Sequence, residues 1–102
     1  MIKIFLDDYR TPSAEEREMI TVRSYQHCIL LLDIFRDSLE FVDLDYDLGT
    51  KETGFDVLKY MNEKNIRPKH INIHSDHPAG ASEMRQYAEL YFQDVAITYN
   101  KI

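Results

Sequence analysis

The sequence contains few cysteine, glycine and proline residues and no long hydrophobic run, which excludes several specialised classes of protein. Its 102 residues include one cysteine, Cys28, which excludes an internal disulfide and a zinc site built from several thiolates. Glycine and proline occur three times each and 12% of the residues are aromatic, which argues against disorder. No hydrophobic run approaches the roughly 18 residues that a membrane helix needs. We therefore expect a single domain over residues 1–102, with enough chain for one core.

Basic residues are also scarce relative to acidic ones. The 18 Asp and Glu residues outnumber the 12 Lys and Arg residues, which gives a formal net charge of −6. Because such a chain repels long phosphate backbones, we expect no extended nucleic-acid surface and no membrane partner. Acid at Asp7 and Asp8 comes too early for a signal peptide, which predicts a cytoplasmic protein.

Segments with strand character alternate along the chain with segments of helical period. This alternation predicts an α/β fold with a five-stranded parallel sheet, and right-handed crossovers favour a doubly wound arrangement. Strands are predicted at residues 2–6, 20–23, 39–45, 70–74 and 95–99. Helices are predicted at residues 24–36, at 55–64 and from Ala81 onward, after a loop at 75–80. Ser13 and Glu16 form a capping box for a shortened first helix, and no full final helix is expected before Ile102.

Three of the predicted strands end in polar side chains. Asp7 and Asp8 follow the first strand, and Asp45 ends the third. His74 and Ser75 stand at the end of the fourth. In an open parallel sheet, ligands bind beyond the carboxyl ends of the strands, where the strand order reverses. Carboxylates that meet there repel one another unless a cation lies between them, and oxygen ligands of this kind suit Mg²⁺.

These residues resemble those of the receiver domain, the phosphoacceptor module of bacterial response regulators, over nearly the whole chain. The residues that carry the resemblance are Asp7, Asp8, Asp45, Gly54, Ser75 and Lys101. The resemblance implies a receiver or flavodoxin-like fold in which Asp7, Asp8 and Asp45 surround Mg²⁺. It also implies that Asp45 attacks phosphorus, while Ser75 and Lys101 contact a phosphoryl oxygen.

Three motifs resemble a narrower family, the cyclic-phosphate-processing receivers. They are LDDYRTP at residues 6–12, LDYDLG at 44–49 and IHSDHPAG at 73–80. The family typically has an LDD-x-R-x-P start, an LDHDLG motif and an HS-x-NP-x-G loop. Two positions depart from this pattern, because Tyr46 stands where the family has histidine and His77 where it has asparagine.

The resemblance favours a metal-assisted phosphoesterase-like domain that acts on a small or terminal 2′,3′-cyclic phosphate. Its substrate would be a small phosphate compound or a nucleic-acid terminus, with Mg²⁺ or Mn²⁺ as the cofactor. Asp45 would attack phosphorus or act as a base toward water, and His74 would protonate the leaving oxygen beside Ser75. Candidate phosphate ligands are Arg10, Ser75, Gly80 and Lys101, and Asp47 and His77 are further candidates for the site.

Other interpretations share the same acidic residues. His74 and His77, with Asp7 or Asp8, would suit Mn²⁺, Fe²⁺ or Zn²⁺, whereas His27 and His70 are expected to be structural. A stand-alone receiver would accept phosphate on Asp45 and signal through a partner protein. A degenerate receiver would only bind a partner, through an apolar patch at Tyr87, Tyr91 and Phe92.

Overall fold

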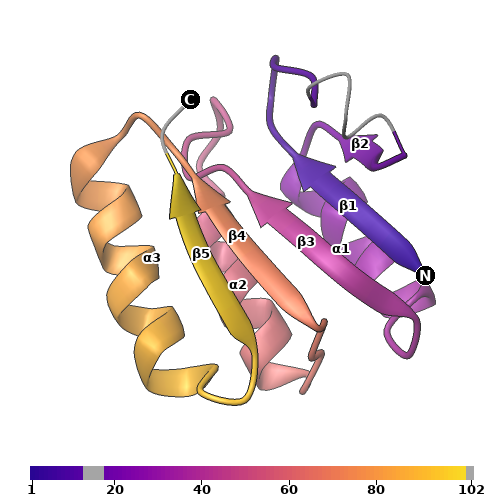
Figure 1. Ribbon diagram of the computed structural model, residues 1–102. Helices are drawn as coiled ribbons and strands as arrows, with labels where there is room; N and C mark the ends of the chain where they lie inside the picture. Colours follow the sequence, from indigo (N-terminus) through magenta and orange to yellow (C-terminus); the bar gives the residue numbers. More distant parts are fainter. Residues whose placement is uncertain (13–17, 101–102) are drawn as a thin grey trace.

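A computed structural model of the chain describes residues 1–12 and 18–100. The described strands are β1 (Ile2–Leu6), β2 (Ile20–Val22), β3 (Leu39–Leu44), β4 (His70–His74) and β5 (Ala96–Asn100). The described helices are α1 (Tyr25–Ile34), α2 (Gly54–Glu63) and α3 (Pro78–Tyr91) (Figure 1). The strands form one parallel sheet in the order β2-β1-β3-β4-β5. This order confirms the predicted α/β fold class, a five-stranded parallel sheet of the receiver or flavodoxin type.

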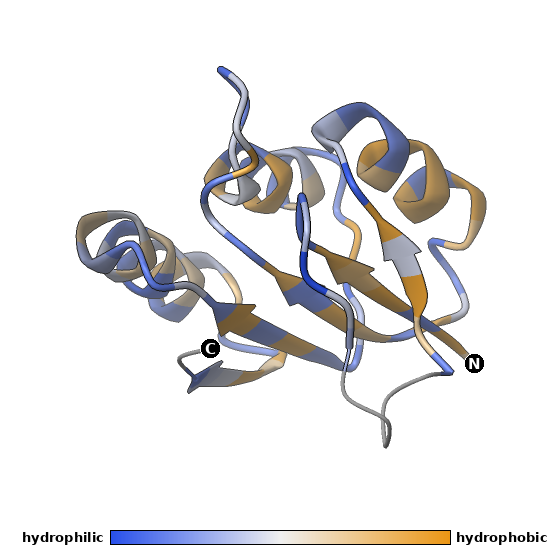
Figure 2. Ribbon diagram, turned by 90° about the horizontal axis from the view of Figure 1, so that it is seen from above, coloured by the Kyte–Doolittle hydropathy of each residue, from blue (hydrophilic) through white to orange (hydrophobic). Residues whose placement is uncertain are grey.

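The three helices lie on the same face of the sheet (Figure 2). From β2 onward the chain crosses the sheet in one direction, through α1 to β3, α2 to β4 and α3 to β5. Right-handed crossovers that run in one direction place their helices on one face. Only the connection from β1 to β2 runs the other way, and residues 13–17 of that connection lie outside the described part.

The core lies between this helical layer and the sheet. Alternate strand residues point into it, among them Leu6 of β1, Leu44 of β3 and Ile73 of β4, all nearly fully buried. The helices contribute residues at helical spacing, such as Leu58 of α2 and Met84 of α3. The strand side chains between them point to the opposite face of the sheet, so they can be polar without entering this core.

Helix α3 begins earlier than the sequence predicted. The loop expected at residues 75–80 ends at His77, and Pro78 opens the helix. His77 is the N-cap, and its Nδ1 accepts a hydrogen bond from the amide of Gly80 at 3.0 Å. Proline suits the first helical position because its fixed φ is already helical and its missing N–H has no partner there. The bounds of β1 and β4 agree with the prediction, and the remaining boundaries differ by at most two residues, within the usual uncertainty of helix and strand ends.

Some predictions fall outside the described residues. Ser13 and Glu16, the predicted capping box of the first helix, lie in the segment that is not described, and Lys101 lies beyond the last described residue. Among residues 1–12 and 18–100, no helix has the length and apolar character of a membrane span.

Gly54 allows α2 to begin against the backbone of the loop that follows β3. A Cβ atom at this position would lie 1.7 Å from the carbonyl oxygen of Asp45, a distance at which no side chain fits. The amide of Gly54 also donates to the carbonyl of Tyr46 at 2.8 Å. The glycine therefore fixes the backbone that carries Asp45.

We predict that Gly54→Ala lowers the free energy of unfolding by about 1–3 kcal/mol, because the new methyl group overlaps a backbone carbonyl. Urea denaturation of the two proteins measures the change. The exposed helical residue Ala79 supplies a control, since Ala79→Ser is expected to change stability by less than about 0.5 kcal/mol. Equal stability of Gly54→Ala and the parent chain would show that the loop is not held in this way.

Candidate metal and phosphate site

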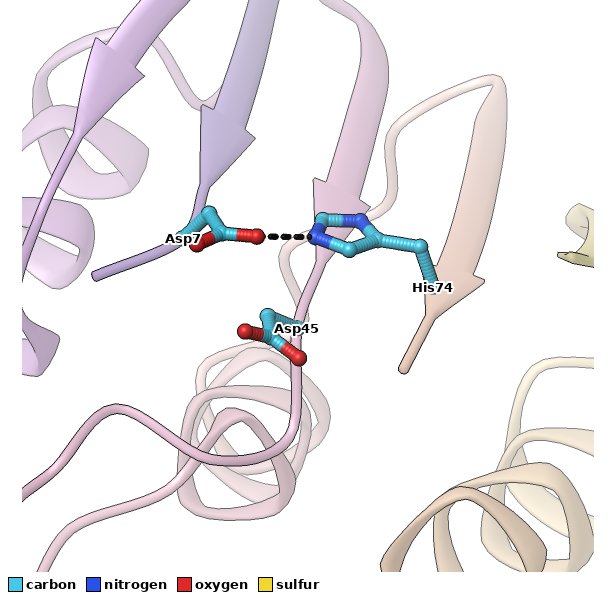
Figure 3. A group of neighbouring side chains, drawn as sticks. All are labelled: Asp7, Asp45 and His74. Atoms are coloured by element: carbon cyan, nitrogen blue, oxygen red, sulfur yellow. Dashed lines mark hydrogen bonds and ion pairs between the residues drawn. The ribbon is translucent and has the colours of Figure 1, made fainter. Parts of the chain in front are cut away.

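Asp7, Asp45 and His74 meet at the carboxyl end of the sheet. They follow or end three adjacent strands, β1, β3 and β4; the side chains of Asp7 and His74 point toward each other, and that of Asp45 lies beside them (Figure 3). One ligand atom from each lies within 4.8 Å of the others, and the residues are at most 3% exposed. The structure thus brings together two of the three predicted metal ligands and the predicted acid.

The His74 ring is held between two carboxylates. Its Nε2 lies 2.9 Å from Asp7 Oδ2 and its Nδ1 lies 2.5 Å from Asp43 Oδ1. The ring also stacks on Phe5, with a centroid distance of 4.8 Å and an interplanar angle of 6°. Each ring nitrogen thus faces a carboxylate oxygen, an arrangement that favours the doubly protonated ring because an ionised carboxylate can only accept a hydrogen bond. Burial alone would lower the pKa of His74, but Asp43 and Asp7 outweigh it and the pKa is raised.

Asp7 stays ionised despite its complete burial. Burial would raise its pKa, yet the net shift is downward because three donors surround the carboxylate. The amides of Tyr9 and Arg10 donate to Oδ1 at 3.0 and 2.8 Å. His74 supplies the third hydrogen bond. The turn that follows β1 therefore directs two of its amides at the Asp7 carboxylate.

Asp45 is the carboxylate whose charge is least compensated. Its Oδ1 accepts a hydrogen bond from the amide of Tyr46 at 2.8 Å. Burial and the negative charge of Asp7 together raise its pKa to about 6, against the opposing charge of His74. A carboxylate with such a pKa is both a base near neutral pH and a group that gains from a nearby cation.

Asp8, which follows Asp7 in the chain, is a further candidate metal ligand. Its Oδ1 is buried and has no hydrogen-bond partner among the described residues. Gly49, at φ +71°, lies against the other oxygen, so that a Cβ there would be 3.4 Å from Asp8 Oδ2. A buried carboxylate oxygen without a donor is costly, and a hard cation would compensate it. Asp7 and Asp45, with His74, form the group that could hold a metal ion, and Asp8 follows Asp7 in the chain with one carboxylate oxygen left uncompensated.

The predicted phosphate ligands lie partly at the same edge. Ser75 follows His74 directly, is buried, and its Oγ accepts from the amide of His77 at 3.0 Å. Arg10 places one guanidinium nitrogen 3.6 Å from Asp7 Oδ2 and another 2.9 Å from Asp76 Oδ2. The amide of Gly80, by contrast, is already bonded to His77.

The two departures from the family pattern contact each other. The rings of Tyr46 and His77 stack with a centroid distance of 4.8 Å and an interplanar angle of 29°. Gly80 leaves room for this stack, since a Cβ there would lie 2.4 Å from carbons of the Tyr46 ring. Nδ1 of His77 accepts the Gly80 hydrogen bond, and His77 is not part of the group that could hold a metal ion.

The remaining candidates lie away from this group. Asp47 is exposed and its Oδ1 accepts from the amide of Gly49 at 2.9 Å, which shapes the turn. His70 contacts Thr98 Oγ1 at 2.8 Å across the sheet. His27 is exposed on α1, and of the aromatic patch suggested for a protein partner, Phe92 is buried in the core.

Two buried polar residues were missed by the sequence reasoning. Asp43 of β3 and Asn72 of β4 are each at most 4% exposed, and Asn72 Nδ2 donates to Asp43 Oδ1 at 2.9 Å. Asp43 and Asp45 are two residues apart, as are Asn72 and His74. The sequence does contain a signal for them, because polar residues two positions apart in otherwise apolar strands point to the same face of the sheet.

We predict that metal affinity depends on pH through Asp45. A cation binds the ionised carboxylate, so protonation below a pKa of about 6 competes with the metal. The affinity for Mn²⁺, measured by calorimetry, is expected to fall about tenfold from about pH 7 to about pH 5. In Asp45→Asn the affinity should be weaker and this pH dependence should disappear. An unchanged affinity of the parent chain across this range would contradict the assignment.

We also predict that Asp43 maintains the charge of His74. In Asp43→Asn the ring loses one of its two carboxylate partners, so the pKa of His74 should fall toward its ordinary value. An NMR titration of the His74 ring signals measures the change. Glu40→Gln is the control, because Glu40 lies on the same strand but pairs with Lys3 at 3.6 Å. If Asp43→Asn leaves the His74 titration unchanged, Asp43 does not have this role.

A comparison with protein families agrees with the geometry of the site. The model of the family described as cyclic-phosphate processing receiver domain matches residues 2–90. No curated protein and no solved structure matches the sequence. The match extends from β1 to the last turns of α3 and so includes the residues of the site described above. The chain belongs to the cyclic-phosphate processing receiver domain family.

Proposed function

We propose that the domain is a metal-assisted phosphoesterase that opens a 2′,3′-cyclic phosphate on a small substrate or at a nucleic-acid terminus. The observation that carries this proposal is the buried group of Asp7, Asp45 and His74 in a member of a cyclic-phosphate processing family. Mg²⁺ or Mn²⁺, held by Asp7, Asp8 and Asp45, would neutralise the charge of the phosphate and orient one of its oxygens.

Asp45 is the proposed base. Without a metal ion its pKa is about 6, so that it is largely ionised at neutral pH, and it would take a proton from the water that attacks phosphorus. One oxygen of Asp45 is bonded to the amide of Tyr46, which orients the carboxylate. Attack by Asp45 itself on phosphorus is the competing role, and it would leave a phosphoryl group on the protein.

His74 is the proposed source of the proton for the leaving oxygen. Asp43 and Asp7 raise the pKa of the ring, which favours its protonated form. Its Nε2, which lies 2.9 Å from Asp7 Oδ2, would exchange this partner for the leaving oxygen and donate the proton to it directly. Asp43 remains bonded to Nδ1 and stabilises the ring in both protonation states, which makes Asp43 a positioning residue.

The reaction balances with water as the only co-reactant. Water forms a new bond to phosphorus, and one of the two ester bonds of the cyclic phosphate breaks. Asp45 gains the proton of the water while the leaving ribose oxygen receives the proton that His74 gives up. The product is a phosphomonoester with one free hydroxyl, and solvent restores both side chains.

Ser75 and Arg10 are the proposed contacts to the phosphate. Ser75 Oγ accepts from the amide of His77, which leaves the hydroxyl hydrogen for a phosphoryl oxygen. Arg10 lies between Asp7 and Asp76, and its planar group can exchange the exposed Asp76 for a phosphate oxygen. Both residues would stabilise charge that grows on the phosphate in the transition state.

The test is hydrolysis of a nucleoside 2′,3′-cyclic phosphate with Mg²⁺ and with Mn²⁺. Turnover is expected to need the metal and to fall by about 100-fold or more in Asp45→Asn and in His74→Ala. Asp47→Asn is the matched control, because Asp47 is an exposed acid in the same loop and should leave turnover unchanged.

Other outcomes separate the competing functions. Equal turnover in the parent chain and Asp45→Asn, or no turnover above background, would overturn the esterase proposal. Gain of a stable phosphoryl group on Asp45 from an acyl phosphate, without turnover, would instead support a stand-alone receiver. Absence of both reactions would leave a module that only binds a partner.

A further inference from the structure

A second feature lies next to the proposed phosphate site, on its β5 side. A cavity of about 580 Å³ opens between the first turns of α3 and the end of β5. Its polar lining residues are Ser75, Asp76, Ser82, Arg85, Tyr99 and Asn100. This volume lies within the range of about 300–1,000 Å³ that is typical of small-molecule sites. A phosphate group alone would fill only a small part of it.

The cavity begins where the phosphate is proposed to bind. Ser75 lines it and also follows His74 in the chain. Asp76, another lining residue, accepts a hydrogen bond from Arg10 at 2.9 Å. A molecule with its phosphate at Ser75 and Arg10 would therefore extend directly into the cavity.

The wall of the cavity suits a flat ring with polar edges. The Arg85 guanidinium lies over the Tyr99 ring, with its Cζ 4.7 Å from the ring centroid. The side chains of Ser82 and Asn100 add donors and acceptors at the rim.

Charge limits what the rest of the ligand can be. The chain carries a formal net charge of −6, and the cavity wall has one acid, Asp76, and one base, Arg85, and so no excess of positive charge. A second phosphate or a long polyanion would be repelled there, whereas an uncharged heterocycle would not.

We propose that this cavity binds the nucleoside of the substrate, with the base stacked at Arg85 and Tyr99, so that the domain acts on a mononucleotide-sized phosphate. This inference rests on the proposed function for the position of the phosphate. Arg85 and Tyr99 are then specificity residues, because they contact the base and not the reacting bond.

Calorimetry with Mg²⁺ and two probes, adenosine 3′-monophosphate and inorganic phosphate, tests the proposal without turnover. The nucleotide is expected to bind at least about tenfold more tightly than phosphate, since stacking of the base adds to the binding of its phosphate. Arg85→Ala should weaken nucleotide binding by at least about fivefold and leave phosphate binding unchanged. The Arg85 side chain is 61% exposed, so its removal should not disturb folding.

Arg36→Ala is the matched control, because Arg36 is an exposed arginine that contacts the carbonyl of Lys64 instead of the cavity. Equal affinity for nucleotide and phosphate, or equal loss of both in Arg85→Ala, would overturn the cavity assignment and leave the phosphate site standing. Absence of binding by both probes would overturn the phosphate site together with the cavity. Tight, Arg85-dependent nucleotide binding without turnover of cyclic phosphates would retain the cavity and reject the esterase.

Discussion

The hydrogen bonds that hold the His74 ring between Asp7 and Asp43 are the interaction on which the site depends. The carboxyl groups of Asp7, Asp43 and Asp45 are almost fully buried at one edge of the sheet, with the His74 ring among them and the Arg10 guanidinium 3.6 Å from Asp7. Burial and the negative charge of Asp7 nevertheless raise the pKa of Asp45 to about 6, so His74 and Arg10 do not fully compensate the negative charge of the site. The orphaned oxygen of Asp8 adds to it. Burial of these carboxyl groups thus favours either protonation of Asp45 or a nearby cation, and a cation there would agree with the metal-assisted chemistry proposed above.

The same network explains why the polar side chains of Asp43 and Asn72 can be buried on this face of the sheet. Asp43 accepts hydrogen bonds from both His74 and Asn72, and Asn72 is in turn bonded to Thr98 and Asn100 of β5. A buried polar group costs little when each of its donors and acceptors is paired. On the side of the site toward α3, Tyr46 and His77 stack on each other above Gly80. These two departures from the family pattern therefore pack against each other.

Much of the site could be predicted from the sequence because strand ends in a parallel sheet converge. Asp7, Asp45 and His74 each follow an apolar run, and the strand order brings those runs side by side. Asp43 and the cavity at Arg85 could not be found in this way. The partner of a residue inside a strand depends on the register between strands, and the wall of the cavity depends on where α3 begins, which the sequence placed at Ala81 instead of Pro78. The N-cap role of His77 was the missing information.

The central claim is that a divalent cation binds among Asp7, Asp8 and Asp45, and paramagnetic broadening by Mn²⁺ tests it most directly. In an NMR titration with substoichiometric Mn²⁺, the amide signals of Asp8 and Tyr46 are expected to disappear first. Signals at the opposite end of the strands, such as those of Leu39 and Lys69, should persist. A second group of acids beside α2, Glu52, Asp56 and Glu63, provides an internal comparison. Broadening centred on that group, or none that is specific, would contradict the account.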